Sequence, residues 1–138
     1  MLAYAGLFAW CFLAATVLPL GSEAALGALV VDRGELLAPV LAATAGNVLG
    51  ACTTYWLGRG AARVVARHRG PAKKEARAAR LLRRHGSPAL LLSSLPVVGD
   101  ALVALAGASR VPLGAFLLWV TLGKAARYAA VAWAVSSL

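Results

Sequence analysis

The sequence predicts an all-α integral membrane protein made of two inverted repeats. Each repeat is a re-entrant helical hairpin followed by a transmembrane helix, and a basic cytoplasmic helical segment joins them. Of the 138 residues, 61% are hydrophobic and 14% are charged, whereas a soluble domain is about 45–50% apolar and about 25% charged. A soluble domain of this length cannot bury so much apolar surface. The formal net charge of +9 comes from one central segment, and the flanking residues align with each other at a fixed spacing.

The first expected repeat covers residues 1–58 of a single membrane domain, 1–138. Residues 1–22 carry no charge, but Pro19 and Gly21 break any helix there. A short apolar run, 24–31, leads to a polar turn at 32–35. These two short arms are the expected hairpin.

An uncharged stretch at residues 36–58 follows, and it is long enough to span a membrane. Gly46 and Gly50 form a GxxxG pattern within it, which is typical of a helix-packing face. Asn47 lies in the middle of this span, so we expect its side chain to hydrogen-bond to a neighbouring helix.

The basic connector covers residues 59–86. It holds ten Lys and Arg residues and one acid, Glu75, while the four acids and four bases elsewhere cancel. The positive-inside rule keeps such a segment in the cytoplasm. Because membrane segments flank it, we expect it to contact anionic lipid headgroups rather than nucleic acid. Gly70 and Pro71 divide it into two helical stretches.

The second expected repeat covers residues 87–138. Its apolar stretch 87–109 is interrupted at residues 96–100, and arms of about nine residues reach only about 13 Å as helices. The stretch is therefore either a kinked span or a re-entrant hairpin. A break facing lipid would leave carbonyl groups without partners, which favours the hairpin. The final span, 111–138, contains Lys124 and Arg127.

The two halves align without a gap at a spacing of 77 residues. The alignment matches rare residue types, pairing Pro19 with Pro96, Glu23 with Asp100, Arg33 with Arg110, Gly46 with Gly123 and Trp56 with Trp133. It also places Asn47 on Lys124. A hairpin and one span make an odd number of crossings, so the second copy enters the membrane in the opposite orientation. Paired, interrupted short segments in inverted repeats are typical of transporter binding sites.

Four blocks of the sequence carry a family resemblance: ATVLPLGSE, AGNVLGACTTYWLGR, LPVVGDALVALAGASR and LGKAARY. Their order and spacing resemble the YqaA branch of the DedA family, in the VTT-domain superfamily. The resemblance implies two facing re-entrant hairpins in a bacterial inner membrane. It also implies lipid translocation, because relatives move undecaprenyl phosphate or phospholipid, with proton coupling through embedded acids. Longer members of the family carry arginines beside the second hairpin tip, in a proline-arginine motif, whereas LPVVGD contains no arginine. The identity of the relatives' substrate is therefore not transferred to this chain.

The candidate substrate or proton-coupling site consists of four embedded charges: Glu23, Asp100, Lys124 and Arg127. Each costs about 2.5–3.5 kcal/mol at the bilayer centre unless it is paired. Lys124, Arg127 and Tyr128 share one helical face, which we expect to meet the hairpin tips. The supporting residues are Asn47, Arg110, Tyr128, Pro19 and Pro96.

The expected chemistry is phosphate binding coupled to proton transfer. Arg127 and Arg110 would hold a lipid phosphate, and protonation of Glu23 or Asp100 would free a cation for it. An alternative interpretation is structural, because Ser22 and Asp100 are suitable N-caps for the helices that follow them.

The leading functional prediction is a flippase or scramblase for phospholipid or polyprenyl phosphate, and the alternatives are a small-solute or ion-coupled transporter and a structural or assembly protein. An enzyme is not expected, because GxSxG, HExxH and phosphate-loop patterns are absent. No cofactor or metal site is expected, because Cys11 and Cys52 have no second ligand at a metal-binding spacing. The expected partners are membrane lipids with anionic headgroups, and a homodimer stays an open alternative to a monomer.

Overall fold

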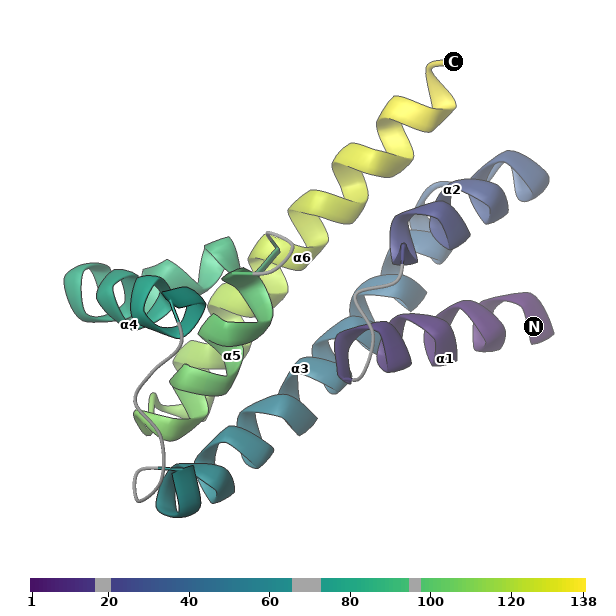
Figure 1. The fold of residues 1–138 in the computed structure, drawn as a ribbon. Coiled ribbons are helices and arrows are strands. Elements are labelled where there is room, and N and C mark those ends of the chain that lie inside the picture. Colours follow the sequence, from purple (N-terminus) through teal and green to yellow (C-terminus); the bar gives the residue numbers. More distant parts are fainter. Residues whose placement is uncertain (17–20, 66–72, 95–97) are drawn as a thin grey trace.

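The computed structural model describes residues 1–16, 21–65, 73–94 and 98–138, which are almost entirely helical (Figure 1). The elements in chain order are α1 (Leu2–Thr16), α2 (Ser22–Arg33), α3 (Leu37–Val65), α4 (Lys73–His85), the 3₁₀ helix η1 (Ser87–Ser94), α5 (Val98–Ala108) and α6 (Leu113–Ser136). No strand occurs in the described ranges. The all-α prediction is confirmed.

The two helices α3 and α6 contain segments long and apolar enough to cross a membrane, Leu37–Ala61 and Leu113–Ser136. Only 39% and 33% of their most apolar windows are buried, and large side chains such as Leu41 and Leu118 face outward. An exposed apolar surface of this kind suits lipid rather than water. Both expected spans are therefore present, although α3 continues to Val65, into the predicted connector.

The short helices fold back on each other in pairs. Tyr4, at the start of α1, donates a hydrogen bond from its hydroxyl to Glu35 Oε2, 2.9 Å away and just beyond the end of α2. In the second pair, Ser87 of η1 and Ser109 after α5 line one cavity. The ends of each pair therefore lie together, while Pro19 and Pro96 fall outside the described residues. The first arm of the second pair is a 3₁₀ helix, and eight residues at about 2 Å each reach only about 16 Å.

Glycines allow the helix backbones to approach closely. A Cβ atom on Gly50 would lie 2.6 Å from the Phe12 carbonyl oxygen, and one on Gly46 would overlap the Phe8 carbonyl group. The GxxxG pattern of α3 is therefore the face on which α1 packs, as predicted. A Cβ on Gly58 would likewise overlap the Ala104 carbonyl, where α3 crosses α5.

The buried side chains form two separate hydrophobic cores. The first core joins α4, η1 and α5 to the C-terminal half of α3 and the start of α6, through Ala51, Tyr55, Ala78, Leu82, Ala89, Leu90, Leu102, Val103, Ala106, Phe116 and Val120. The second core joins α1 and α2 to the other ends of α3 and α6, through Leu7, Cys11, Leu26, Val30, Ala43, Tyr128 and Ala132. Both cysteines are free thiols.

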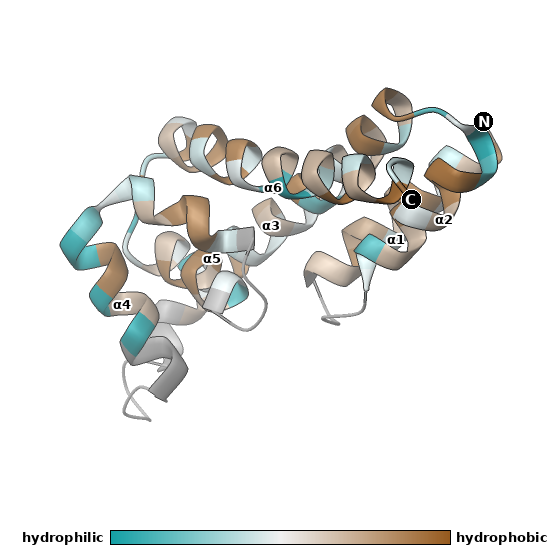
Figure 2. Cartoon of the chain, turned by 90° about the horizontal axis from the view of Figure 1, so that it is seen from above, coloured by the Kyte–Doolittle hydropathy of each residue, from teal (hydrophilic) through white to brown (hydrophobic). Residues whose placement is uncertain are grey.

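The basic helix α4 covers the first core with one face. Ala78 and Leu82 are buried, whereas Arg77, Arg80 and Arg84 are exposed. Figure 2 shows the hydrophilic residues of α4 on the outside of the bundle. The apolar side of this helix is used for packing within the chain, so its exposed surface is charged.

We expect the Gly46→Ala substitution to destabilise the protein, because the new methyl group overlaps the Phe8 carbonyl. Overpacking of this kind lowers the free energy of unfolding by about 1–3 kcal/mol. Thermal unfolding in detergent measures the effect. The control is Gly6→Ala on α1, where a Cβ meets nothing within 4 Å. That protein should be as stable as wild type or more stable, and equal losses in both variants would contradict the packing role of Gly46.

Candidate functional site

A layer of polar side chains separates the two hydrophobic cores. On α3, Asn47 lies one turn from each of two core residues, Ala43 and Ala51. On α6, Lys124 occupies the same kind of position between Val120 and Tyr128. The Lys124 ammonium donates a hydrogen bond to Asn47 Oδ1. Lys124 is 5% exposed and Asn47 is 6% exposed, so a buried cation lies at the centre of the bundle.

The Tyr128 hydroxyl links this pair to α2. Asn47 Nδ2 donates a hydrogen bond to it over 2.7 Å, and the Ser22 hydroxyl lies 2.8 Å away. Tyr128 is only 1% exposed, and its hydroxyl connects α2 and α3 to α6.

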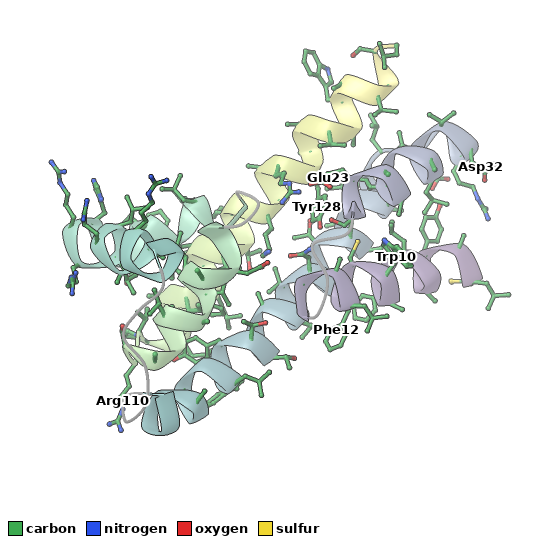
Figure 3. The ribbon with its side chains drawn as sticks, viewed as in Figure 1. Trp10, Phe12, Glu23, Asp32, Arg110 and Tyr128 are labelled. Atoms are coloured by element: carbon green, nitrogen blue, oxygen red, sulfur yellow. The ribbon has the colours of Figure 1, made fainter. Side chains whose placement is uncertain are left out.

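An ion pair between Arg127 and Glu23 lies beside this network. The guanidinium Nη2 contacts Glu23 Oε1, and both side chains are about one-third exposed. The Arg127 guanidinium carbon also lies 6.0 Å from the centre of the Tyr128 ring. Figure 3 shows Glu23 and Tyr128 close to each other at the centre of the molecule. The expected pairing of the basic face of α6 with Glu23 is confirmed.

Asp100 lies on α5. It belongs to the first turn of α5 and interacts electrostatically with Lys124. Among the described residues, however, Lys124 forms no ion pair with a carboxylate, and Asn47 is its direct partner. The four embedded charges therefore comprise one contact ion pair and one longer-range pair.

The interpretation of Ser22 and Asp100 as N-caps is wrong. Helix α2 starts at Ser22 after Gly21, and no side chain caps it. The Ser22 hydroxyl bonds to Tyr128 instead. Helix α5 starts at Val98, so Asp100 lies within its first turn rather than before it, where its charge still suits the helix dipole. The part that Ser22 takes in the polar layer was not predicted, because a partner on a distant helix leaves no local pattern.

Arg110 does not join the cluster. It is exposed after the end of α5, with a positive φ of 57°, and Figure 3 places it far from Glu23 and Tyr128. The expectation that Arg110 and Arg127 hold one phosphate together is therefore wrong. The candidate site is reduced to the polar layer, with Lys124 and Arg127 as its cations. Among the described residues, no three His, Cys, Asp or Glu side chains form a metal-binding group.

Comparison with known proteins identifies relatives over most of the chain. The VTT domain family model matches residues 18–137. Inner membrane protein YqaA of Escherichia coli is 42% identical over 127 residues, covering 91% of this chain and 86% of the relative, and the Shigella flexneri protein of that name matches equally. An uncharacterized protein of Haemophilus influenzae is 41% identical over 133 residues, and the match covers 91% of this chain and 82% of the relative. No solved structure matches.

We expect Tyr128→Phe to destabilise the protein, because it removes the hydroxyl that bonds Asn47 and Ser22. The Ser22 hydroxyl and Asn47 Nδ2 would lose this partner, which lowers the free energy of unfolding by about 1–2 kcal/mol. The matched control is Tyr4→Phe, which removes an exposed hydrogen bond to Glu35 and should change stability little. Thermal unfolding of both variants in the same detergent tests the difference, and equal midpoints would exclude a stabilising role for the Tyr128 hydroxyl.

Proposed function

The chain belongs to the VTT-domain family, in its YqaA branch, and from this premise we propose that it carries lipids with anionic headgroups between the leaflets of the inner membrane. It is an integral membrane protein of the inner membrane, as its Escherichia coli relative is named to be. The proposed substrates are phospholipid or polyprenyl phosphate. The observation that carries the proposal is the buried ammonium of Lys124 beside the Arg127–Glu23 ion pair.

The cations of the polar layer are suited to a phosphate group. Lys124 has three N–H donors, and the described residues provide one direct acceptor, Asn47 Oδ1. Arg127 follows by three positions, so both cations project from neighbouring positions on α6. Arginine binds phosphate oxygens through two parallel hydrogen bonds. A phosphate that entered beside α6 would therefore find a bidentate donor and a second cation.

In the proposed transport cycle, a proton compensates the negative charge of the bound phosphate. Without substrate, Glu23 and Asp100 balance Arg127 and Lys124. A bound phosphodiester adds one negative charge, and an uncompensated charge inside a membrane is costly. Uptake of one proton by Glu23 keeps the site neutral and weakens the Glu23–Arg127 ion pair, so that the guanidinium can also contact the phosphate. Loss of that proton restores the Glu23–Arg127 pair and releases the lipid.

Contacts between equivalent positions support the proposed inverted repeat. Gly27 of α2 faces Val135 of α6. At the spacing of 77 residues, Gly27 corresponds to Ala104 and Val135 corresponds to Gly58. Ala104 and Gly58 also meet, where α5 crosses α3. Gly46 packs against α1, and its equivalent, Gly123, packs against η1. Asn47 and Lys124 are themselves 77 residues apart and bond to each other, as residues on a two-fold axis would.

The paired ends of the short helices support re-entrant hairpins. In the proposed topology, the α1–α2 pair enters from the periplasm and the η1–α5 pair enters from the cytoplasm, where the basic connector lies. The two pairs then enter the membrane from opposite sides, which provides a route for a headgroup between the leaflets. Such an arrangement at the membrane midplane is typical of secondary transporters.

We expect purified protein in liposomes to accelerate exchange of a fluorescent phosphatidylglycerol between leaflets, and Lys124→Met and Arg127→Gln to abolish the acceleration. Both substitutions remove a cation from the proposed phosphate site. Dithionite quenching of the outer-leaflet fluorophore measures the exchange rate. The control is Arg80→Gln, an exposed position on α4, which should retain the rate.

The double variant Glu23→Gln/Arg127→Gln separates transport from structure. It removes both charges of the pair, so no unpaired charge stays behind, and stability should recover relative to Arg127→Gln alone. Transport should not recover, because the phosphate donor is still missing. Wild-type exchange rates in the double variant would refute the proposal. Uptake of a soluble solute without lipid exchange would instead favour a solute transporter.

We expect cysteines at the two ends of each hairpin to react from the same side of the membrane. Ser87→Cys and Ser109→Cys, in a protein lacking Cys11 and Cys52, should react with an impermeant maleimide only from the cytoplasm. Ala3→Cys and Asp32→Cys should react only from the periplasm. Labelling of intact cells and of inverted vesicles measures the sides. Reaction of Ser87→Cys and Ser109→Cys from opposite sides would refute the hairpin topology.

A further inference from the structure

An apolar cavity of about 260 Å³ lies between the start of α3 and the end of α6. It is lined by Leu36, Leu37, Val40, Ala129, Ala132 and Trp133. Leu37 and Trp133 are 73% and 71% exposed at its rim, whereas Ala132 is buried at its floor. The cavity is therefore open to the surroundings of the two membrane-crossing segments.

The equivalent space at the other end of the α3–α6 pair is filled. There the Tyr55 ring packs on Phe116 with 4.5 Å between ring centres, and its hydroxyl donates a hydrogen bond to the Val111 carbonyl over 2.6 Å. In the alignment of the two halves at a spacing of 77 residues, Tyr55 corresponds to Ala132 and Phe116 corresponds to Pro39. The cavity therefore lies where the second repeat lacks the aromatic side chain that the first repeat provides.

The lining determines which kind of molecule fits. A buried water needs two to four polar partners, and all six lining side chains are apolar. The cavity lies at the ends of both candidate spans, Leu37–Ala61 and Leu113–Ser136, and Trp133 stands where the aromatic belt of a membrane protein lies. The apolar molecules that surround a protein at this depth are lipids, whose acyl chains match the lining in chemistry.

We propose that this cavity is a binding site for one acyl chain of a membrane phospholipid, which takes the place that Tyr55 has at the other end. The inference uses the proposed repeat and the membrane location, and it does not depend on transport activity. The bound chain packs between α3 and α6 at the end opposite the basic connector. It stabilises that end of the helix pair, as the Tyr55–Phe116 contact stabilises the other.

Photolabelling of the protein in phosphatidylglycerol liposomes tests this site. The probe is a phosphatidylglycerol with a diazirine on one acyl chain, and mass spectrometry of peptides locates the label. Residues 36–40 and 129–133 should be labelled several-fold more than the segment around Leu118 and Leu122, which faces outward elsewhere on α6. Equal labelling of all outward-facing segments would overturn the proposal, because it indicates unspecific contact with bulk lipid.

A matched pair of substitutions checks that the cavity itself causes the labelling. Ala129→Phe fills the cavity and should remove the excess label, whereas Ala130→Phe, at the next exposed position outside the lining, should retain it. Native mass spectrometry of the wild-type protein gives a measurement that needs no variant, and one phospholipid should stay bound after detergent exchange. Excess label that persists in Ala129→Phe would refute the site. Cross-links between two copies at residues 129–133 would also refute it, because a second chain then covers the cavity.

Discussion

The hydrogen bond between Lys124 and Asn47 holds a charged side chain between two hydrophobic cores, and the surrounding packing is arranged around it. Asn47 is neutral, so it satisfies one N–H of Lys124 without cancelling the charge. Its amide nitrogen donates a hydrogen bond to the Tyr128 hydroxyl, which also bonds to Ser22 of α2. A buried cation needs such partners, so each helix around the polar layer contributes to keeping Lys124 inside.

Close approach of the backbones makes this arrangement feasible. Helices in lipid gain little from hydrophobic burial and depend on van der Waals packing and small residues. Gly46 allows α1 to lie directly on α3, and Gly58 allows α5 to do so nearer the connector. The neighbouring polar side chains can then reach across the gap between helices. The close packing ends near Ala132, where the two spans leave a cavity.

The sequence predicted the membrane class, both spans, the packing role of GxxxG and the pairing of Arg127 with Glu23. These predictions succeeded because each depends on a strong local signal: a long uncharged run, a fixed glycine spacing, or a charge too costly to leave alone in a membrane. It failed for Arg110, which lies away from Glu23 and Tyr128, and for the caps at Ser22 and Asp100. Those residues had suitable neighbours in sequence, but their position on the folded helices determined their actual surroundings.

The sequence by itself determined which segments are apolar enough for lipid, where the positive charge gathers and which rare residues recur at a spacing of 77. Hydropathy, charge and helix breaks act over a few residues, so they can be read locally. Only the tertiary structure decided that Lys124 contacts Asn47 directly and Asp100 only at longer range, and that Ser22 bonds to Tyr128. These partners depend on how far each helix is rotated and how closely it approaches, and both are set by side chains on other helices.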